Sequence, residues 1–478
     1  MKRLILSILS MTFICLSSSA MGPKARSLTE EKNYLLSIYP ISEVTSTEEL
    51  TTETSVEEVT YFDGIGRPVE EIQRGFGASY NDIVTFHQYD ALGREPSQML
   101  PSVGTGTGAY VDINTYRNKA ASLYDDTVPY STIEFESSML SRPLSVMGAG
   151  EKWTDADKKV RYQYLANTFS GELSCWHFIV SGSRDNHTLV RVGLYSANHL
   201  QVTKMVDEDN NSTISFQDSD GRNILTRKVI DGKYADTYYV YDNYGNLCYV
   251  LSPEGSEAWN RNEKVVATDK LGFQYRYDER NRCIAKKLPG ADWIYYIYDV
   301  NDRLIFTQDG NMRTQGKWLM TLCDAEGRET IRGIYTGTAS QLGVDELDMH
   351  TADASSGGYL GYVLPSSLSP SSISLRSVTY YDDYSKVNTL FSVPANVVGF
   401  REIDGLDSTN DSRTQGLMTG RLIYSEDGTT SSPIFYYYDK RGRLIQQRRS
   451  DGYTLGQSYD FRGLTTATYE EQIANGDT

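Results

Sequence analysis

Apolar and polar residues alternate along most of this chain, with the period of two that is typical of half-buried β-strands. Residues 237–241 and 247–251 are clear examples, because both runs are rich in Tyr, Val and Leu and flank a short polar stretch. The pattern predicts a series of antiparallel hairpins. Alternation breaks near residues 117–124 and 259–264, where we expect short helices.

The polar stretches between the runs share one motif: an aromatic residue, Asp, two variable residues, Gly or Asn, and then Arg. Consecutive copies from Asp218 to Asp324 follow one another at intervals of 21 to 36 residues. Tyr precedes the Asp in most copies, which fits the excess of 36 Tyr over 14 Phe. Asp382 marks a degenerate copy.

Turn chemistry explains why these residues recur. The Asp can accept hydrogen bonds from turn amides, and the Gly or Asn supplies the positive φ that a tight reversal needs. A catalytic residue has no reason to be copied so often. The predicted turn residues are Asp63, Gly66, Arg67, Asp90, Gly93, Arg94, Asp218, Gly221, Arg222, Asp242, Gly245, Asp278, Asp299, Asp324, Gly327, Arg328, Asp439, Gly442, Arg443, Asp460 and Gly463.

A single two-stranded hairpin is only marginally stable, so neighbouring hairpins are expected to pair edge to edge. Such pairing gives an all-β fold, in which the hairpins form a long antiparallel sheet that curves and spirals because strands twist.

The motif and its spacing resemble the bacterial Rhs or YD-repeat family. Residues 58–68, 135–153 and 236–247 are also similar to secreted members of that family with an Rhs-type amino-terminal domain. The resemblance implies an open or partial β-sheet shell, which in some members encloses a carboxy-terminal toxin. This sequence contains no Asp-Pro dipeptide and ends soon after its last copy. We therefore expect no Rhs core and no toxin domain, and we transfer no catalytic residue.

Composition along the chain suggests its organisation. We expect a signal peptide at 1–20, a Thr/Glu-rich lead-in at 21–60, and an amino-terminal β module at 61–153. The main repeat region covers 154–335, a Ser/Gly/Pro-rich linker or long loop covers 336–378, and further repeats cover 379–478.

Charge and targeting signals narrow the class of protein. A net charge of −17 disfavours a nucleic-acid groove. Lys2 and Arg3, a short apolar run and Ser19-Ala20 are typical of a cleavable signal peptide. We therefore expect a protein that is secreted or in the cell envelope, without a transmembrane segment. Ile14 before Cys15 argues against a lipoprotein, and the four later cysteines do not make a disulfide framework.

Other candidate chemistry is weak. Residues 104–108 form a glycine-rich run without the Lys-Ser/Thr of a phosphate loop, so we expect a flexible hairpin tip. Residues 207–211 place oxygen ligands as a calcium loop would, but lack its later Gly and Glu, and a polar turn is the preferred interpretation. The five histidines lack paired ligand spacing. We predict no catalytic, cofactor-binding or metal-binding residues.

Two functional hypotheses follow. The first is a secreted, non-enzymatic scaffold of the Rhs type that encloses or presents a partner, such as an Rhs core or effector polypeptide or another envelope protein. The alternative is an adhesin-like protein that recognises glycan or another cell through aromatic residues, including Trp153, Trp176, Trp259, Trp293 and Trp318.

Overall fold

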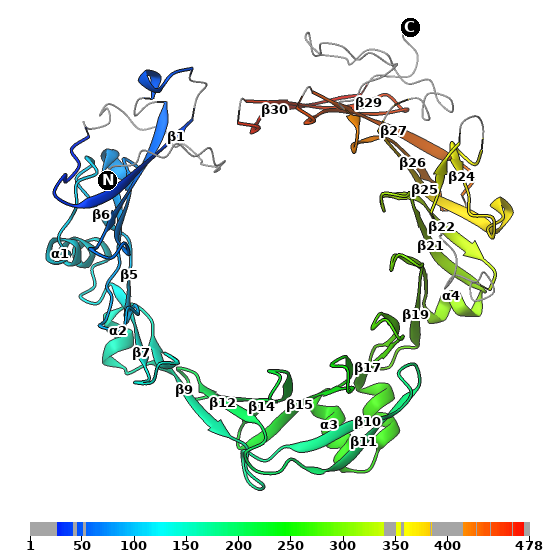
Figure 1. Cartoon of the computed structure of the whole chain (residues 1–478), viewed down its shortest axis with the longest axis horizontal. Coiled ribbons are helices and arrows are strands. Elements are labelled where there is room, and N and C mark those ends of the chain that lie inside the picture. Colours follow the sequence, from blue (N-terminus) through cyan, green and yellow to red (C-terminus); the bar gives the residue numbers. More distant parts are fainter. Residues whose placement is uncertain are drawn as a thin grey trace. The chain divides into compact units, whose positions relative to one another are not determined.

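The computed structural model describes residues 26–41, 45–50, 54–338, 350–354, 358–382, 384, 414–426, 428–439, 441–460 and 462–472. Antiparallel strands are the main secondary structure of these residues, which is the all-β class that the alternation predicts (Figure 1). The chain divides into two compact units. The first contains residues 1–175 and 194–236, and the second contains residues 176–193 and 237–478.

The first unit holds two runs of hydrogen-bonded strands. One has the order β1 (Asn33–Pro40), β2 (Ser55–Phe62), β3 (Pro68–Arg74), β4 (Ile83–Phe86) and β6 (Ser102–Val103). The other has the order β5 (Ser97–Met99), β7 (Tyr130–Phe135), β8 (Pro143–Met147), β9 (Lys159–Ala166), β12 (Gln201–Val206), β13 (Ser212–Gln217) and β14 (Asn223–Ile230).

Helix α1 (Ile113–Tyr124) closes the core of the first unit. The Asp112 side chain caps it by accepting hydrogen bonds from the amides of Asn114 and Thr115. Tyr116 and Ala120 are buried on its inner face and join the core cluster that includes Val59, Tyr61, Ile72 and Val84. A second helix, α2 (Glu151–Asp155), is a single short turn.

Where the structure describes it, the Thr/Glu-rich lead-in expected over 21–60 contains strand β1 and most of strand β2. Strand β2 is the central partner of β1 and β3, and its alternate residues from Ser55 are buried. Buried Glu57 on this strand is paired with Arg74 at 2.8 Å and with Arg26 at 2.6 Å. Glu57 and the other residues of β2 therefore belong to a folded sheet, where ion pairs compensate the buried charge.

The second unit is built mainly of consecutive hairpins. Its strands are β15 (Lys233–Tyr241, from Thr237 onward), β16 (Leu247–Leu251), β17 (Gly272–Tyr277), β18 (Cys283–Lys287), β19 (Trp293–Tyr298), β20 (Leu304–Gln308), β21 (Lys317–Cys323), β22 (Glu329–Thr336), β25 (Ile373–Tyr381), β26 (Met418–Tyr424), β27 (Ser431–Tyr438), β28 (Leu444–Arg449), β29 (Tyr453–Tyr459) and β30 (Thr465–Gln472). Neighbouring hairpins pair edge to edge, as β16 does with β17 and β18 with β19.

In the predicted linker over 336–378, the described residues 336–338, 350–354 and 358–378 form an excursion from the sheet. Strand β22 pairs directly with β25, so the repeats before and after the excursion are neighbours. Between them lie the short strands β23 (Ala352–Asp353) and β24 (Tyr362–Val363). Buried Tyr362 stacks on Tyr380 at 5.7 Å, and its hydroxyl donates to the Thr379 carbonyl. The excursion therefore packs onto the sheet, and its last residues belong to β25.

Part of the second unit's sheet is covered by a hairpin and a helix. The hairpin consists of β10 (Trp176–Gly182) and β11 (His187–Leu194), and the helix is α3 (Pro253–Asn260), followed by a π-helical turn at Val266–Lys270. Phe178 of β10 contacts Trp259 of α3 at 5.4 Å between ring centroids. A short helix α4 (Gly310–Thr314) connects β20 and β21.

Buried Glu70 should make the first unit less stable as the pH rises. Its carboxyl group is fully buried in β3 and accepts the Val111 amide at 3.0 and 3.1 Å. Burial raises the pKa of Glu70 to about 8, and Asp82 and Asp112 reinforce the increase against Lys32. A folded-state pKa above the unfolded value means that the folded state binds more protons, so stability is lost as pH rises from about 4.5 to 8.

We expect Glu70→Gln to remove this pH dependence, because the amide stays neutral and can still accept the Val111 hydrogen bond. Relative to wild type, the variant should gain about 1–3 kcal/mol of stability between pH 6 and 9. Chemical denaturation of the first unit at both pH values measures the difference. An identical pH profile for wild type and variant would contradict the interpretation.

Candidate functional site: the repeat turns

Each motif copy forms a closed turn held by its own Asp. In the copy at Asp299, the Asp amide donates to the Arg303 carbonyl at 2.9 Å, and the Asp302 amide donates to the Asp299 carbonyl at 3.1 Å. The Asp299 carboxylate accepts the amides of Asn301 and Arg303 on Oδ1 and the Arg303 Nε on Oδ2. We call these five residues a repeat turn, and its fifth residue the closing residue.

The same backbone bonds recur throughout the described chain. The Asp amide donates to the closing carbonyl at 2.8–3.1 Å in the turns that begin at Asp63, Asp90, Asp207, Asp218, Asp242, Asp278, Asp299, Asp324, Asp439 and Asp460. Most closing residues are Arg, whose Nε donates to the Asp Oδ2, as Arg67, Arg94, Arg222, Arg282, Arg328 and Arg443 do. In the turn at Asp460 the closing residue is Leu464, and Arg462 supplies this bond instead.

The fourth residue of each turn has the left-handed backbone that the motif requires. Its φ is +85° at Gly327 and +74° at Gly442, and Asn281 and Asp302 take φ of +63° and +61°. The strand register shifts by one residue beside many of these turns, as it does between Val240 and Tyr241 and between Ile297 and Tyr298. A type I turn followed by a left-handed residue is a common three-residue hairpin connection.

The calcium-like stretch at 207–211 is another repeat turn. Asp207 Oδ1 accepts the amides of Asp209 and Asn211, and its Oδ2 accepts the Asn211 side-chain amide at 2.9 Å. Asn210 has the left-handed φ of +65°. The Asp207 carboxylate is therefore engaged in the turn. Sequence comparison missed this copy because Val206 stands in place of the aromatic residue and Asn211 in place of Arg.

The degenerate copy at Asp382 is a repeat turn whose ends lie far apart in sequence. The Asp382 amide donates to the Leu417 carbonyl at 3.0 Å, and Asp382 Oδ1 accepts the Gly416 amide at 2.7 Å. Gly416 has φ of +81°. Leu417 occupies the closing position, and Arg328 of another turn binds both Asp382 oxygens at 2.8 and 2.9 Å.

The closing Arg also binds the next turn, a contact that sequence analysis did not anticipate. Nη1 of Arg282 donates to the Asp299 carbonyl at 3.0 Å, and Nη1 of Arg303 donates to the Asp324 carbonyl at 2.8 Å. Arg443 makes the same bond to Asp460. The guanidinium face lies over the next motif aromatic ring, at 5.1 Å for Arg282 and Tyr298.

The motif Tyr returns a hydrogen bond to the preceding hairpin. The Tyr298 hydroxyl donates to the carbonyl of Cys283, the residue that follows the closing Arg282. The same bond joins Tyr89 to Pro68, Tyr277 to Leu247, Tyr381 to Glu329, Tyr438 to Met418 and Tyr459 to Leu444. Each such pair of turns is thus coupled by an Arg contact, a Tyr contact or both, and we call this series of contacts the inter-turn ladder.

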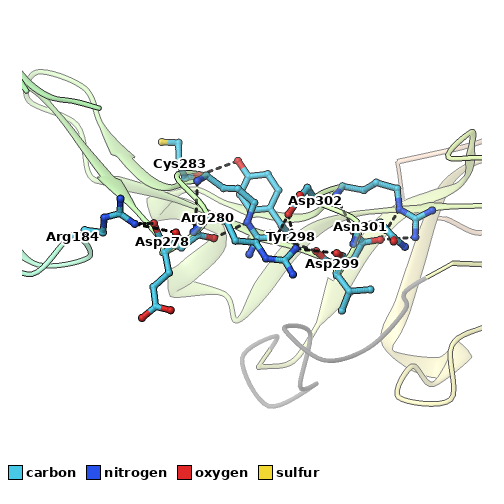
Figure 2. Close-up of polar contacts among 12 residues, drawn as sticks. Arg184, Asp278, Arg280, Cys283, Tyr298, Asp299, Asn301 and Asp302 are labelled. Atoms are coloured by element: carbon cyan, nitrogen blue, oxygen red, sulfur yellow. Dashed lines mark hydrogen bonds and ion pairs between the residues drawn. The ribbon is translucent and has the colours of Figure 1, made fainter. Parts of the chain in front are cut away.

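Figure 2 shows one step of the ladder, between the turns at Asp278 and Asp299. The Tyr298 hydroxyl points at Cys283, and Arg280 reaches Asp302, which it binds at 2.9 Å. Arg280 also donates to the Val300 carbonyl at 3.0 Å. A variable position of one turn therefore adds a further bond to the next.

The turn carboxylates are chemically occupied. The amide of the closing Arg lowers the pKa of Asp63 and of Asp90, and the Arg side chains add to the effect. A carboxylate held ionised by amides and a guanidinium is a poor general acid. The carboxylates of the repeat turns therefore serve to connect strands and are not arranged for acid–base chemistry.

The glycine-rich loop at 104–108 is a packed loop, and the prediction of a flexible tip is wrong. Buried Asp82 accepts the amides of Gly106 and Gly108 on Oδ2 and the Gly75 amide on Oδ1. The Tyr61 hydroxyl donates to the Gly108 carbonyl. The loop amides that a phosphate would need are therefore used by Asp82.

Most of the tryptophans are covered by neighbours. Arg191 lies over Trp176 at 4.3 Å, Arg276 lies over Trp293 at 4.8 Å, and Trp259 is buried. Trp318 packs against the core of the second unit. Trp153 is the exception, with 43% of its surface exposed. These contacts do not favour a row of open rings for sugar stacking.

Other reactive groups are scattered or buried. Within the described residues, no group of three or more His, Cys, Asp or Glu could hold a metal ion. Among the described residues, Cys175, Cys248, Cys283 and Cys323 are thiols outside any disulfide, and burial raises the pKa of Cys248 to about 12. No described helix is long and apolar enough to cross a membrane. The expected signal peptide lies outside the described residues.

Comparison with known proteins adds two findings. Residues 38–166 match a family model described as a domain of unknown function, DUF6443. The match begins within β1, so it includes part of the segment that the sequence assigned to a lead-in. No curated protein matches the chain.

Several solved structures are similar to the chain. They include TcdB2-TccC3 without its hypervariable C-terminal region (14% identity, TM-score 0.47, 89% of this chain and 18% of that chain) and TcdB2-TccC3 (13%, 0.47, 89% and 19%). A Photorhabdus luminescens Tc holotoxin pore structure matches with 13% identity and a TM-score of 0.46, over 89% of this chain and 18% of that chain. The chain spans less than a fifth of the length of these structures.

Gly327 should be required because of its positive φ and not because a larger side chain would lack space. A Cβ at this position would meet no atom within 4 Å, but its φ is +85°. We expect Gly327→Val to destabilise the second unit by about 1–2 kcal/mol, and Gly327→Asn by less, because Asn tolerates this region. Denaturant unfolding of both variants measures the difference, and equal losses would contradict a backbone origin.

The Tyr298 hydroxyl should contribute to the ladder separately from its ring. Tyr298→Phe removes the hydrogen bond to Cys283 and is expected to lower the free energy of unfolding of the second unit by about 0.5–1.5 kcal/mol. Tyr244→Phe is the matched control. The Tyr244 side chain is 68% exposed, so its change should stay below about 0.5 kcal/mol. A smaller effect at Tyr298 than at Tyr244 would refute the assignment.

Proposed function

We propose that this chain is a secreted structural protein, a repeat-built β-sheet wall of the Rhs type that encloses or presents a partner polypeptide. The inter-turn ladder is the observation that carries the proposal. The motif Asp and Arg side chains are directed at their own turn or at the next turn, so the repeated residues serve to join hairpins.

The contacts between neighbouring hairpins suit a sheet that must stay closed. Edge-to-edge pairing joins the hairpins through backbone bonds, and the ladder joins them again at the turns through side chains. Where the ladder is present, two independent sets of contacts restrain a hairpin relative to the next. A sheet held in this way resists opening at any single hairpin, which is what a container or a presenting surface needs.

The proposal includes three further points. The chain acts without catalysis, because its recurring carboxylates are bound within turns. It is exported by a cleavable signal peptide at residues 1–20 to the cell exterior or envelope. Its partner is an Rhs core or effector polypeptide or another envelope protein, and glycan recognition is not favoured because most tryptophans are covered.

Protection of a partner from proteases tests the proposal. The mature chain, from Met21, is produced together with the protein encoded directly downstream of it, and the complex is treated with a protease. We expect cleavage of an enclosed partner to slow by about tenfold or more, because proteases cut the exposed form. The rate is followed on gels against the partner produced alone.

Matched variants connect protection to the ladder. Arg303→Ala removes bonds to Asp299 and to the Asp324 carbonyl, and should reduce protection. Arg261→Ala removes only exposed ion pairs with Glu257 and Glu263, and should leave protection unchanged. A partner cleaved equally fast with and without the chain would refute the enclosing role. Selective glycan binding that Trp153→Ala abolishes would support the adhesin hypothesis instead.

A further inference from the structure

The hairpin formed by β10 and β11, residues 176–194, lies against strands that follow it much later in the sequence. We call this hairpin the strap. Nearly all of it belongs to the second unit, although the residues on both sides of it belong to the first. Its contacts with β15, β16, β17 and α3 are therefore contacts within one unit.

The tip of the strap is held by two arginines. Arg184 at the tip donates to the carbonyls of Asp278 and Glu279 at 3.2 and 3.0 Å, and to Asn281 Oδ1 at 2.7 Å. Its guanidinium also lies 3.5 Å from the centre of the Tyr244 ring. In the opposite direction, Arg276 of β17 donates to the Asp185 carbonyl and to Asn186 Oδ1.

An apolar contact holds the body of the strap. Phe178 is buried and packs edge-on against Tyr238 at 5.0 Å and Trp259 at 5.4 Å. Leu189 of β11 is also buried. Lifting the strap would expose these rings to water, so the docked state is favoured by burial of apolar surface.

His187 lies between the tip and the body of the strap and is almost fully buried. Its Nε2 is 3.0 Å from the Tyr275 carbonyl, and a carbonyl only accepts, so Nε2 carries the proton. The His187 carbonyl accepts the Tyr249 hydroxyl at 3.0 Å, and the two rings meet edge-on. In the part of the chain that the structure describes, the buried Nδ1 has no hydrogen-bond partner.

The surroundings of His187 oppose a second proton. Burial lowers the pKa of His187, and the Arg276 guanidinium from β17 lowers it further. The Tyr275 carbonyl, Asp242 of the neighbouring turn and Asp185 at the strap tip act in the other direction but do not reverse the shift. A proton on Nδ1 would be a buried donor without an acceptor.

We propose that the strap is an acid-sensitive latch, in which neutral His187 keeps the hairpin docked on β15–β17 and α3 and protonated His187 releases it. The release would uncover the aromatic surface of Tyr238 and Trp259 without unfolding the repeat hairpins. This inference stands independently of the proposed wall function, because it concerns only the second unit's own contacts.

The direction of the effect follows from linkage. The docked His187 has a lower pKa than the undocked one, so docking releases a proton. The equilibrium constant for docking is therefore at its highest above the undocked pKa of about 6.5. Below that pH it falls by up to tenfold for each pH unit, until the docked pKa is reached.

Hydrogen exchange of the full mature chain tests the latch. Deuterium uptake is measured at pH 7.5, 6.5, 5.5 and 5.0, with times scaled for the intrinsic pH dependence of exchange. We expect the protection of residues 176–194 to fall by roughly tenfold or more between pH 6.5 and 5.0. Residues 317–336, in β21 and β22 of the same unit, serve as the internal reference and should keep their protection.

Two histidine variants identify the responsible group. His187→Gln retains a donor for the Tyr275 carbonyl and cannot titrate, so the strap should lose most of its pH dependence, whatever its absolute protection. His177→Gln changes the other histidine of the strap, which is only partly buried and whose pKa burial also lowers, so it should remove a smaller part of the pH dependence and leave the larger part in place.

Arg184→Ala should lower the protection of residues 176–194 at every pH, because it removes contacts at the strap tip. The change of protection with pH should stay as in the wild type, because no titrating group is removed. The latch is refuted if wild-type protection of residues 176–194 is constant between pH 6.5 and 5.0. It is also refuted if His187→Gln keeps the wild-type slope, or if residues 317–336 lose protection in parallel.

Discussion

The guanidinium of the closing Arg is the contact on which the repeat architecture depends. It binds its own Asp through Nε, the next turn's backbone through Nη1, and the next aromatic ring through its face, as Arg282 does. Two-stranded hairpins are marginal by themselves. A side chain that completes one turn and at the same time docks the following turn makes local folding and neighbour pairing mutually supportive, which is the condition for a cooperative array.

Sequence reasoning predicted the features that are local. Alternation predicts the strands, and the spacing of Asp and Gly predicts turns with a left-handed fourth residue, because both depend on a few adjacent residues. The ladder was not predictable in the same way. Tyr381 and its acceptor Glu329 are 52 residues apart in sequence, and no local pattern names the partner. The Asp207 turn escaped detection although it keeps the residues that form the turn bonds. It has Val206 where the motif has an aromatic residue, and Asn211 where the motif usually has Arg.

Buried polar residues account for the other failures. Glu57 and Asp82 make their segments appear solvent-exposed in the sequence, yet both side chains are buried. Glu57 is compensated by ion pairs, and Asp82 accepts hydrogen bonds from loop amides. Composition cannot separate a carboxylate in water from one that organises a loop. The strap presents a similar problem, since nothing local in residues 176–194 says which surface they cover. Only the placement of Phe178 and Arg184 shows that.

Strand β25 shows what closed turns allow during the divergence of such a chain. It is joined to β22 and to β26 by long connections, yet it pairs antiparallel with both, and the Asp382 turn closes through Leu417 as the short turns do. The entropy of closing a loop grows only with the logarithm of its length. Once the terminal residues of a turn supply its hydrogen bonds, the sheet is nearly indifferent to the length of sequence between them. Turns of this kind are places where a chain can accept additional segments while the pairing of its sheet stays the same.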